Sequence, residues 1–449
     1  MEQFDLIIIG AGSGNSILTE DFDDWKVALV ERGAFGGTCL NRGCIPSKML
    51  IYPASIVETV RSAGPLGVDA HVDNVRWSEI VERVFGRIDP IAAGGEEYRR
   101  SLDNVTVFAE DARFVGPKQV QVGHQTITAD TIVLAAGARP RVPDIPGLAE
   151  VPFHTSATVM RLEEVPPRLA TLGGGFIACE MGHVFKAAGS DVTIINRSKN
   201  LLGAHDDEVS ERFTEVFGER FNLRCGEVPS HVRHENGEFI IEFDGGDPIV
   251  ADQLLVATGR IPNGEQLGVA NTGVELNDAG YVVVDEHQRT GVEGIWALGD
   301  ICNPMQLKHT ANAETRVLAH NIHNPTDLRT VNYSGAPSAV FTHPQIATVG
   351  RTERDLAAEG INYVAHTQPY SATAYGWAME DDHGFCKVIC DADTRQLLGA
   401  HIIGHEASLL IQQLVLGMRF GLTVDEMATG PLYIHPALSE VVEQALLEL

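Results

Sequence analysis

The sequence predicts an α/β protein that ends in a separate α+β domain. Two observations support this prediction. A short apolar strand, a glycine-rich turn and a helical stretch follow one another twice, with the turns at residues 10–15 and 173–178. Beyond about residue 331 this pattern stops, and short predicted strands at 339–342 and 384–389 mix with an amphipathic helix at 408–420.

At 449 residues the chain is too long for a single hydrophobic core, and we expect about three domains. The proline-rich stretch at 139–152 is interpreted as a linker between the first two, and residues 295–300 as a return to the first. In chain order, the predicted segments are residues 1–145, the first part of one nucleotide-binding domain; 146–262, a second nucleotide-binding domain; 263–330, the return to the first; and 331–449, the C-terminal domain.

Composition and charge restrict the function. The net charge of −28 argues against binding to nucleic acid or to anionic membrane surfaces. No apolar run approaches the roughly 18 residues that cross a membrane, and a strand predicted at residues 4–9 leaves no room for a signal peptide. The seven cysteines are too few and too scattered for a framework of structural disulfides. We therefore expect a cytoplasmic protein in which any disulfide is catalytic.

The first glycine-rich turn has the features of a dinucleotide-binding loop. Gly10 and Gly12 allow the backbone to approach a pyrophosphate, and a short helix expected after Gly14 would supply free N–H groups and a positive dipole end. Glu31 ends the next strand, 21 residues after Gly10, close to the spacing of about 20 expected for a carboxylate that binds ribose hydroxyls. Asn15 stands where a third glycine is expected, so we expect a looser helix–strand contact there.

The second turn carries Gly173 and Gly175, with the small Ala178 at the helix-packing position. The strand after it ends in Asn196 and Arg197 rather than in a carboxylate. A carboxylate would repel a 2′-phosphate, whereas an arginine can pair with it. The second turn therefore favours NADPH over NADH, although Arg197 could also be a solvated surface residue.

The most specific segment is residues 36–48, Gly-Gly-Thr-Cys-Leu-Asn-Arg-Gly-Cys-Ile-Pro-Ser-Lys. Cys39 and Cys44, five residues apart at a helix start, can form a bridge if the backbone winds suitably. A helix N-terminus and Lys48 would both stabilise a thiolate. A pair of buried structural cysteines is the alternative, and it leaves the glycines, the proline and the lysine unexplained. We therefore predict a redox-active disulfide.

Near the C-terminal end, His435 is followed five residues later by Glu440. A carboxylate at this spacing could fix the tautomer of the imidazole and raise its basicity. A disulfide reductase needs such a group, because the leaving thiolate must be protonated.

The other cysteines are interpreted as structural. Cys386 and Cys390 lie on one face of a predicted strand without His or Cys neighbours in sequence, so no metal site is expected. Cys179, Cys225 and Cys302 are interpreted as small core hydrophobes.

Together these segments resemble the pyridine nucleotide–disulfide oxidoreductases, the family of glutathione reductase and dihydrolipoamide dehydrogenase, over essentially the whole chain. The resemblance implies that the first domain binds FAD, that the second binds NAD(P)H and that the last forms a homodimer. It also implies that each active site borrows His435 and Glu440 from the other subunit.

The resemblance assigns roles to the residues of the redox segment. Cys44 would face the flavin as a thiolate, and Cys39 would attack the substrate disulfide. Lys48 would lie near the flavin and pair with Glu180.

Other residues are assigned to the cofactors in the same way. Asp300 would contact the ribityl chain of FAD, and the helix around His309 would support the reduced flavin with its positive end. Phe176 stands where relatives often have a tyrosine that covers the flavin, so it can stack but has no hydroxyl group. The remaining expected cofactor contacts are Thr38, Gly137 and Gly259.

The redox segment alone leaves several relatives open. A dihydrolipoamide dehydrogenase, an NAD-linked subunit of a larger complex, would be expected to have an acidic residue in place of Arg197. A mercuric reductase would be expected to have a C-terminal cysteine pair, and a large thioredoxin reductase a C-terminal redox extension; neither follows Glu440. A flavin-dependent redox sensor or quinone reductase would not need a general acid such as His435.

We therefore expect an NADPH-dependent enzyme that reduces a small disulfide. Four segments, residues 12–17, 84–91, 374–381 and 435–440, extend the resemblance to relatives that reduce mycothione, the disulfide of a thiol carried on a sugar–inositol scaffold. Glutathione disulfide is the alternative small substrate.

Overall fold

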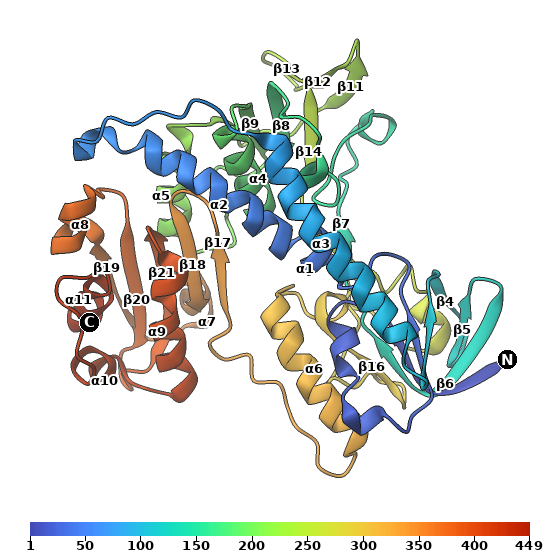
Figure 1. The fold of residues 1–449 in the computed structure, drawn as a ribbon. Coiled ribbons are helices and arrows are strands. Elements are labelled where there is room, and N and C mark those ends of the chain that lie inside the picture. The colour runs from blue at the N-terminus through green and yellow to red at the C-terminus, as the bar shows by residue number, and fades with distance from the viewer. The chain divides into compact units, whose positions relative to one another are not determined.

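The computed structural model describes residues 1–449, which divide into two compact units (Figure 1). The first unit consists of Met1–Ser47, Ile80–Arg141 and Gly259–Tyr333. The second unit consists of Lys48–Glu79, Val142–Thr258 and Ser334–Leu449. The division into four segments that the sequence predicts stays a prediction.

The first unit is built on a seven-stranded sheet in the order β3-β2-β1-β6-β5-β4, with β16 also paired to β6. Its strands are β1 (Glu2–Ile9), β2 (Val27–Val30), β3 (Val105–Phe108), β4 (Ala112–Gly116), β5 (Gln119–Val122), β6 (Gln125–Leu134) and β16 (Ile295–Ala297). The strands β3, β2, β1, β6 and β16 are parallel, and β4 and β5 are antiparallel. Along β1, Ile7 and Ile9 belong to one core cluster and Leu6 and Ile8 to another, so both faces of the sheet are buried.

Helices and a short ribbon complete the first unit. They are η1 (Ser13–Ile17), η2 (Glu20–Phe22), α1 (Gly37–Arg42), α3 (Trp77–Arg100, from Ile80 onward in this unit), η6 (Val269–Thr272), η7 (Gly299–Ile301), α6 (Lys308–His323) and the antiparallel pair β7 (Ala138–Pro140) and β15 (Arg260–Pro262). The short helix expected after the first glycine-rich turn is present as a five-residue 3-10 helix, η1. Only residues 10–26 connect β1 to β2, and Thr19, Asp21 and Asp23 favour turns over helix in this stretch.

The second unit contains a parallel four-stranded sheet in the order β10-β9-β8-β14. The elements of this part are β8 (Arg168–Leu172), α4 (Phe176–Ala187), β9 (Asp191–Asn196), α5 (Asp207–Gly218), β10 (Asn222–Cys225), β14 (Gln253–Val256), the short η4 (Leu148–Glu150) and η5 (Val159–Arg161), and a three-stranded ribbon of β11 (His231–Glu235), β12 (Glu238–Glu242) and β13 (Ile249–Ala251). The expected strand–turn–helix order is present here, because α4 begins directly after the second glycine-rich turn.

The C-terminal part of the second unit is a five-stranded antiparallel sheet in the order β17-β18-β21-β20-β19, on which α9 packs against β18 and β21 (Figure 1). Its elements are β17 (Pro337–Val340), β18 (Gln345–Gly350), α7 (Glu353–Glu359), β19 (Tyr363–Pro369), η8 (Tyr370–Ala372), α8 (Ala374–Met379), β20 (Phe385–Asp391), β21 (Leu397–Gly404), α9 (Ala407–Phe420), α10 (Val424–Thr429) and α11 (Glu440–Leu447). The unit also includes α2 (Cys44–Arg61) from Lys48 onward and η3 (Gly64–Leu66).

These sheets confirm the predicted fold class of two Rossmann-like parallel sheets and a C-terminal α+β domain. None of the helices is both long enough and apolar enough to cross a membrane.

Candidate active site

The first glycine-rich turn lies tightly against its neighbours. A Cβ at Gly10, whose φ is +112°, would collide with the carbonyl oxygen of Ala135. A Cβ at Gly37, at the start of α1, would lie 2.7 Å from the Cα of Gly12. The two backbones therefore pass each other, at the carboxyl end of β1, at a distance that only glycine permits.

The third close contact of this turn is made by Gly14, not by the residue after it. A Cβ at Gly14 would lie 2.5 Å from the Cβ of Ala135 and 3.2 Å from Ile8 Cγ2. The looser contact expected from Asn15 is therefore not observed. In the short 3-10 geometry of η1 the packing position moves back by one residue, and the Asn15 side chain is bound by Arg99 instead.

Glu31 directly follows β2 and is held at both carboxylate oxygens. The Ala11 N–H donates to Oε2 and the Gly33 N–H to Oε1, each at 2.8 Å. A carboxylate oxygen can accept more than one hydrogen bond, so Glu31 retains capacity for ribose hydroxyls. With the tight glycine turn, this carboxylate fits the dinucleotide end of FAD.

Cys39 and Cys44 lie on either side of a break between two helices. Cys39 is inside α1, Gly43 interrupts the helical backbone, and Cys44 begins α2. The Asn41 amide donates to the carbonyls of Phe35 (2.8 Å) and Gly37 (3.0 Å), which fixes the turn before the pair.

Both cysteines are thiols in the structure; Cys39 is half-buried and Cys44 exposed. A hydrogen bond with Cys44 and burial raise the pKa of the Cys39 thiol, and the positive charge of Lys308 opposes that rise. Of the two sulfurs, Cys39 therefore retains its proton and Cys44 is the exposed one. Thr38, next to the pair in α1, is half-buried.

Asp300 lies in η7 at the carboxyl end of β16. Burial raises the pKa of its carboxyl group, and the opposing charge is Arg260, whose Nη2 lies 3.6 Å from Asp300 Oδ2. The turn is fixed by Glu314 of α6, which accepts from the Gly299 N–H at 2.6 Å. No local motif marks Arg260 or Glu314, so sequence reasoning missed both.

The remaining expected contacts of the first unit lie in glycine turns and at the start of α6. Gly137 (φ +63°) and Gly259 (φ +116°) have left-handed backbones and open space at the Cβ position. His309, the second residue of α6, is exposed.

Lys48 and Glu180 are brought together in the second unit. Lys48 Nζ lies 2.7 and 2.8 Å from the two carboxylate oxygens of Glu180, whose side chain is only 4% exposed. The Phe341 N–H donates to the same carboxylate at 3.0 Å, and its ring centroid lies 4.5 Å from Lys48 Nζ. The lysine side chain is therefore held at a defined position.

The second glycine-rich turn is open where a ligand would approach. Gly173 has a φ of +114° and could not carry a Cβ, which would collide with the Ala257 carbonyl, whereas the Cβ position of Gly175 is empty. Ala178 is buried inside α4, and Phe176 at its first turn is 51% exposed. The uncapped N-terminus of α4 and the open Gly175 fit a dinucleotide phosphate.

Asn196 and Arg197 differ in their availability. The Asn196 amide is buried and donates to the carbonyls of Ser198 (3.0 Å) and Asn200 (2.8 Å), so it shapes the turn after β9. Arg197 is exposed at the end of the strand. Of the two, Arg197 is the one that can meet a ligand.

His435 and Glu440 also form a pair. His435 Nδ1 lies 2.7 Å from Glu440 Oε1, and the Ala437 N–H donates to the other oxygen at 3.3 Å. Glu440 is buried at the start of α11, whereas the His435 side chain is 75% exposed. The carboxylate therefore orients an imidazole whose second nitrogen faces outward.

The remaining cysteines agree only in part with their interpretation. Cys179, Cys386 and Cys390 are buried, Cys302 is half-buried and packs against a core cluster, and Cys225 is half-buried. Both stand at the ends of short elements, where the chain returns to the surface. No cluster of His, Cys, Asp or Glu is arranged to hold a metal ion.

The sequence matches the pyridine nucleotide-disulphide oxidoreductases over residues 4–315 and their dimerisation domain over residues 336–446. The chain belongs to this family. It is therefore an oxidoreductase that uses FAD and NAD(P)H in thiol–disulfide chemistry and carries the family's dimerisation domain.

Several characterised relatives are similar in sequence to this chain over most of its length. It is 46% identical to the mycothione reductase of Mycobacterium tuberculosis over 100% of both chains. It is 34% identical to a dihydrolipoyl dehydrogenase of Chlamydia muridarum, over 99% of this chain and 97% of the relative, and 33% identical to a mercuric reductase of Staphylococcus aureus, over 94% and 78%. Among solved structures, a flavoprotein disulfide reductase of Escherichia coli, RclA, matches with a TM-score of 0.88 at 25% identity over both complete chains.

Proposed function

We propose that this enzyme reduces mycothione to mycothiol, with NADPH as the electron donor and Cys39–Cys44 as the redox-active disulfide. The observation that supports the substrate is the 46% identity to a mycothione reductase over the full length of both chains, against 34% and 33% for relatives with other substrates.

The preference for NADPH is supported by Arg197. Its exposed side chain stands where a carboxylate would reject the 2′-phosphate, and the neighbouring Asn196 amide is already occupied by backbone carbonyls. A guanidinium forms forked, charge-assisted hydrogen bonds with a phosphate.

When bound, FAD would supply the redox chemistry that connects the nicotinamide with the disulfide. The first glycine turn (Gly10, Gly12 and Gly14), with Glu31 and Asp300, would hold it; Thr38, Gly137, Gly259 and His309 are assigned further contacts. Lys48, fixed by Glu180, would place a positive charge near the flavin. The exposed Phe176 would cover the nicotinamide site and move aside for NADPH.

The substrate half of the cycle follows from the proton on Cys39. His435, oriented by Glu440, accepts that proton as Cys39 Sγ attacks one sulfur of mycothione. The substrate S–S bond breaks, and the first mycothiol leaves with the proton returned by His435.

Cys44 then closes the cycle. Its thiolate attacks Cys39 Sγ, the mixed disulfide breaks and the Cys39–Cys44 bond re-forms. The second mycothiol takes up, through His435, a proton that comes from solvent. In total, two electrons leave the cysteine pair, Cys39 and solvent each supply one proton, and two thiols form.

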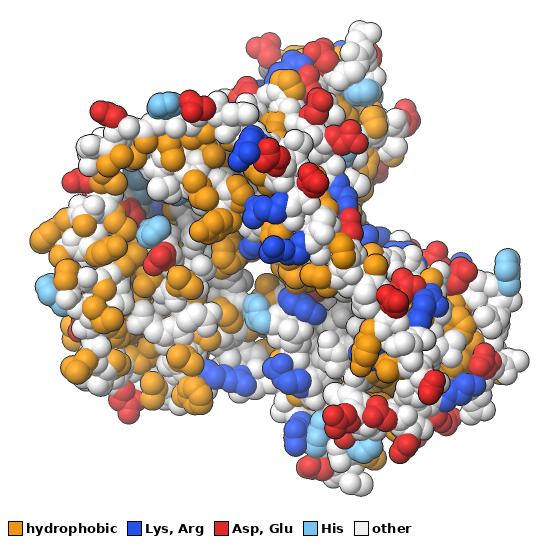
Figure 2. Space-filling model, viewed as in Figure 1, with side chains coloured by type: hydrophobic (Ala, Val, Ile, Leu, Met, Phe, Trp, Pro, Cys, Tyr) orange, Lys and Arg blue, Asp and Glu red, His pale blue; other side chains and the backbone are white.

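We propose that His435 acts on the redox pair of the other subunit. The dimerisation domain exposes large apolar side chains that a partner would cover, and apolar side chains are spread over the C-terminal elements (Figure 2). They include Phe420 of α9, 74% exposed, and Leu432 and Ile434 directly before His435, 100% and 73% exposed. Exposed apolar surface of this kind marks a protein interface.

The test is a steady-state comparison of kcat/KM for mycothione, glutathione disulfide and lipoamide, each with NADPH and with NADH. We expect mycothione with NADPH to give the highest value. Arg197→Ala should lower kcat/KM for NADPH about ten-fold and change that for NADH little, because one charge-assisted contact is lost. A glutathione disulfide or lipoamide value equal to that of mycothione would refute the substrate, and equal losses for the two donors would refute the role of Arg197.

A further inference from the structure

The first glycine-rich turn lacks the support that such turns usually have. In a dinucleotide-binding unit a long helix follows the turn, anchors it on the sheet and directs its positive end at the phosphates. Here only the five residues of η1 follow, without a side-chain cap, and the chain then passes through the three-residue η2 to β2. Such a short 3-10 helix has almost no dipole and little packing surface of its own.

Arg99, in the last turn of α3, holds η1 from one side. Its Nε donates to Asn15 Oδ1 at 2.7 Å and its Nη2 to the Asn15 carbonyl at 2.8 Å. Two contacts from one rigid guanidinium fix both the side chain and the backbone of Asn15. Asn15 is the residue that replaces the third glycine, and glycine could not make the side-chain contact.

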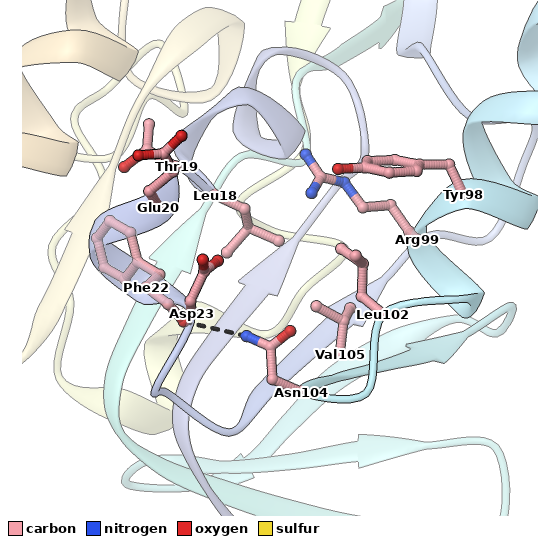
Figure 3. Close-up of a pocket in the computed structure, with 10 residues that line it drawn as sticks. All are labelled: Leu18, Thr19, Glu20, Phe22, Asp23, Tyr98, Arg99, Leu102, Asn104 and Val105. Carbon is pink, nitrogen blue, oxygen red and sulfur yellow. Dashed lines mark hydrogen bonds between the residues drawn. The ribbon is translucent and has the colours of Figure 1, made fainter.

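Arg99 is half-buried and lies beside a cavity. Figure 3 shows Arg99 and Tyr98 reaching from the end of α3 beside a cavity of about 360 Å³ that the segment with Leu18 and Phe22 also lines. Burial lowers the pKa of Arg99, but a guanidinium keeps its charge in proteins. A half-buried cation is thereby bound to neutral oxygens of the turn.

Lys308, the first residue of α6, holds the turn from another element. Its Nζ donates to Ser13 Oγ at 2.8 Å, and Thr315 Oγ1, two turns further along α6, donates to the Ser13 carbonyl at 3.3 Å. Ser13 follows Gly12, whose backbone lies against that of Gly37. A second cation is thus bound to a neutral oxygen next to the position that a pyrophosphate would occupy.

We propose that Arg99 and Lys308 are positioning residues of the flavin-phosphate turn, which together order Ser13–Ile17 and supply the positive charge that the missing helix would have given. The proposal rests on the assignment of this turn to FAD. It predicts that both side chains act on the affinity for FAD rather than on the chemistry at Cys39 and Cys44.

The experiment measures the dissociation constant of FAD by reconstituting apoprotein and following the quenching of flavin fluorescence. Arg99→Ala and Lys308→Ala should each weaken FAD binding about ten-fold, and the double variant about a hundred-fold. Arg99→Lys should recover only part of the loss, because a lysine makes one contact where the guanidinium makes two.

Arg100→Ala is the matched control. Arg100 lies in the same turn of α3 but binds Glu96 and the Val107 carbonyl instead of η1. It should bind FAD like the unmodified protein. The melting temperature of the apoprotein should be the same for Arg99→Ala and Arg100→Ala, since the proposed role is expressed only with FAD.

Two outcomes would overturn the proposal. The first is that Arg99→Ala and Lys308→Ala bind FAD as tightly as Arg100→Ala does. The second is that the melting temperature of the apoprotein falls in parallel with the FAD affinity, which would indicate a merely structural role. Gly12→Leu separates this failure from an incorrect assignment of the turn. If Gly12→Leu binds FAD normally, the turn is not the FAD site; if it alone loses FAD, only the two cations are refuted.

Discussion

At the scale of single residues, the two cysteines of the redox pair differ in their exposure and surroundings. Cys39 is half-buried, with a pKa raised by its hydrogen bond to Cys44 and by burial, whereas Cys44 is exposed. The half-buried Cys39 and the exposed Cys44 are therefore suited to different tasks. The sequence indicates the pair through its spacing, but the assignment of each sulfur to a role comes from the resemblance and stays a proposal.

Replacing either cysteine tests that assignment. Reduction by NADPH should expose two additional titratable thiols in the unmodified enzyme and none in Cys39→Ser or Cys44→Ser, because neither variant can form the disulfide. Both should retain FAD and lose mycothione turnover. Only Cys39→Ser should keep the long-wavelength absorbance of a thiolate beside the flavin.

Cys225→Ser is the control for the cysteine variants, because Cys225 is half-buried and lies outside the redox segment. It should keep full turnover and both reducible thiols. A redox variant that reduces mycothione at a near-normal rate would contradict the roles given to Cys39 and Cys44.

At the scale of elements, the sequence was sufficient to predict those helices and strands that local contacts along the chain determine. The strands flanking both glycine turns, and α4 after the second turn, follow from local hydrophobic pattern and glycine placement. The contacts that hold η1 after the first turn could not be predicted, since they come from Arg99 and Lys308, 84 and 295 residues from their partners in η1. Contacts of this separation have no signal in a local pattern.

A buried ion cluster in the second unit is another feature without a local signal. Lys387 of β20 is 4% exposed and lies 2.8 Å from Asp206, the N-cap of α5, and 3.2 Å from Glu208; it also pairs with Glu353 at the start of α7. Burial would raise the pKa of Asp206, but the bond to Lys387 and the nearby charges lower it below its usual value. The cluster therefore joins three elements through charge.

Removing the lysine should be costly. Lys387→Ala leaves the buried Asp206 carboxylate without its cation and should destabilise the protein by about 3–5 kcal/mol. Lys26→Ala, which breaks a surface pair with Glu2, should cost at most about 1 kcal/mol. Urea unfolding of both variants at neutral pH measures the difference; equal losses would show that the cluster contributes no more than a surface pair.

The cluster also sets a pH dependence. The folded pKa of Asp206 lies below its unfolded value, so its contribution to stability is complete above the unfolded pKa of about 3.9 and is lost as the pH falls through the folded pKa. Acid should therefore reduce the difference in stability between the unmodified protein and Lys387→Ala.

At the scale of the whole molecule, the pairs proposed for catalysis belong to different units. Cys39 and Cys44 lie in the first unit, whereas Lys48–Glu180 and His435–Glu440 lie in the second. Cys39–Cys44 and His435–Glu440 were predictable because each pair lies within one short family motif. The exposed apolar residues before His435 carry no such motif, and their meaning depends on a second subunit.

Subunit exchange tests whether His435 acts across the dimer. His435→Ala should slow mycothione reduction by about 10²–10⁴-fold and leave the reduction of FAD by NADPH unchanged, because only the substrate half of the cycle needs the imidazole. Cys39→Ser should also be inactive toward mycothione, because it lacks the thiol that attacks the substrate.

Mixed in equal amounts and allowed to exchange, the two variants form heterodimers in which one site combines an intact Cys39 with an intact His435 from the other subunit. Since heterodimers are half of the mixture and have one working site of two, about a quarter of the unmodified activity should return. If His435 served its own subunit, every site in the mixture would lack one group. Demonstrated exchange without recovery of activity would therefore show that the histidine acts within one chain.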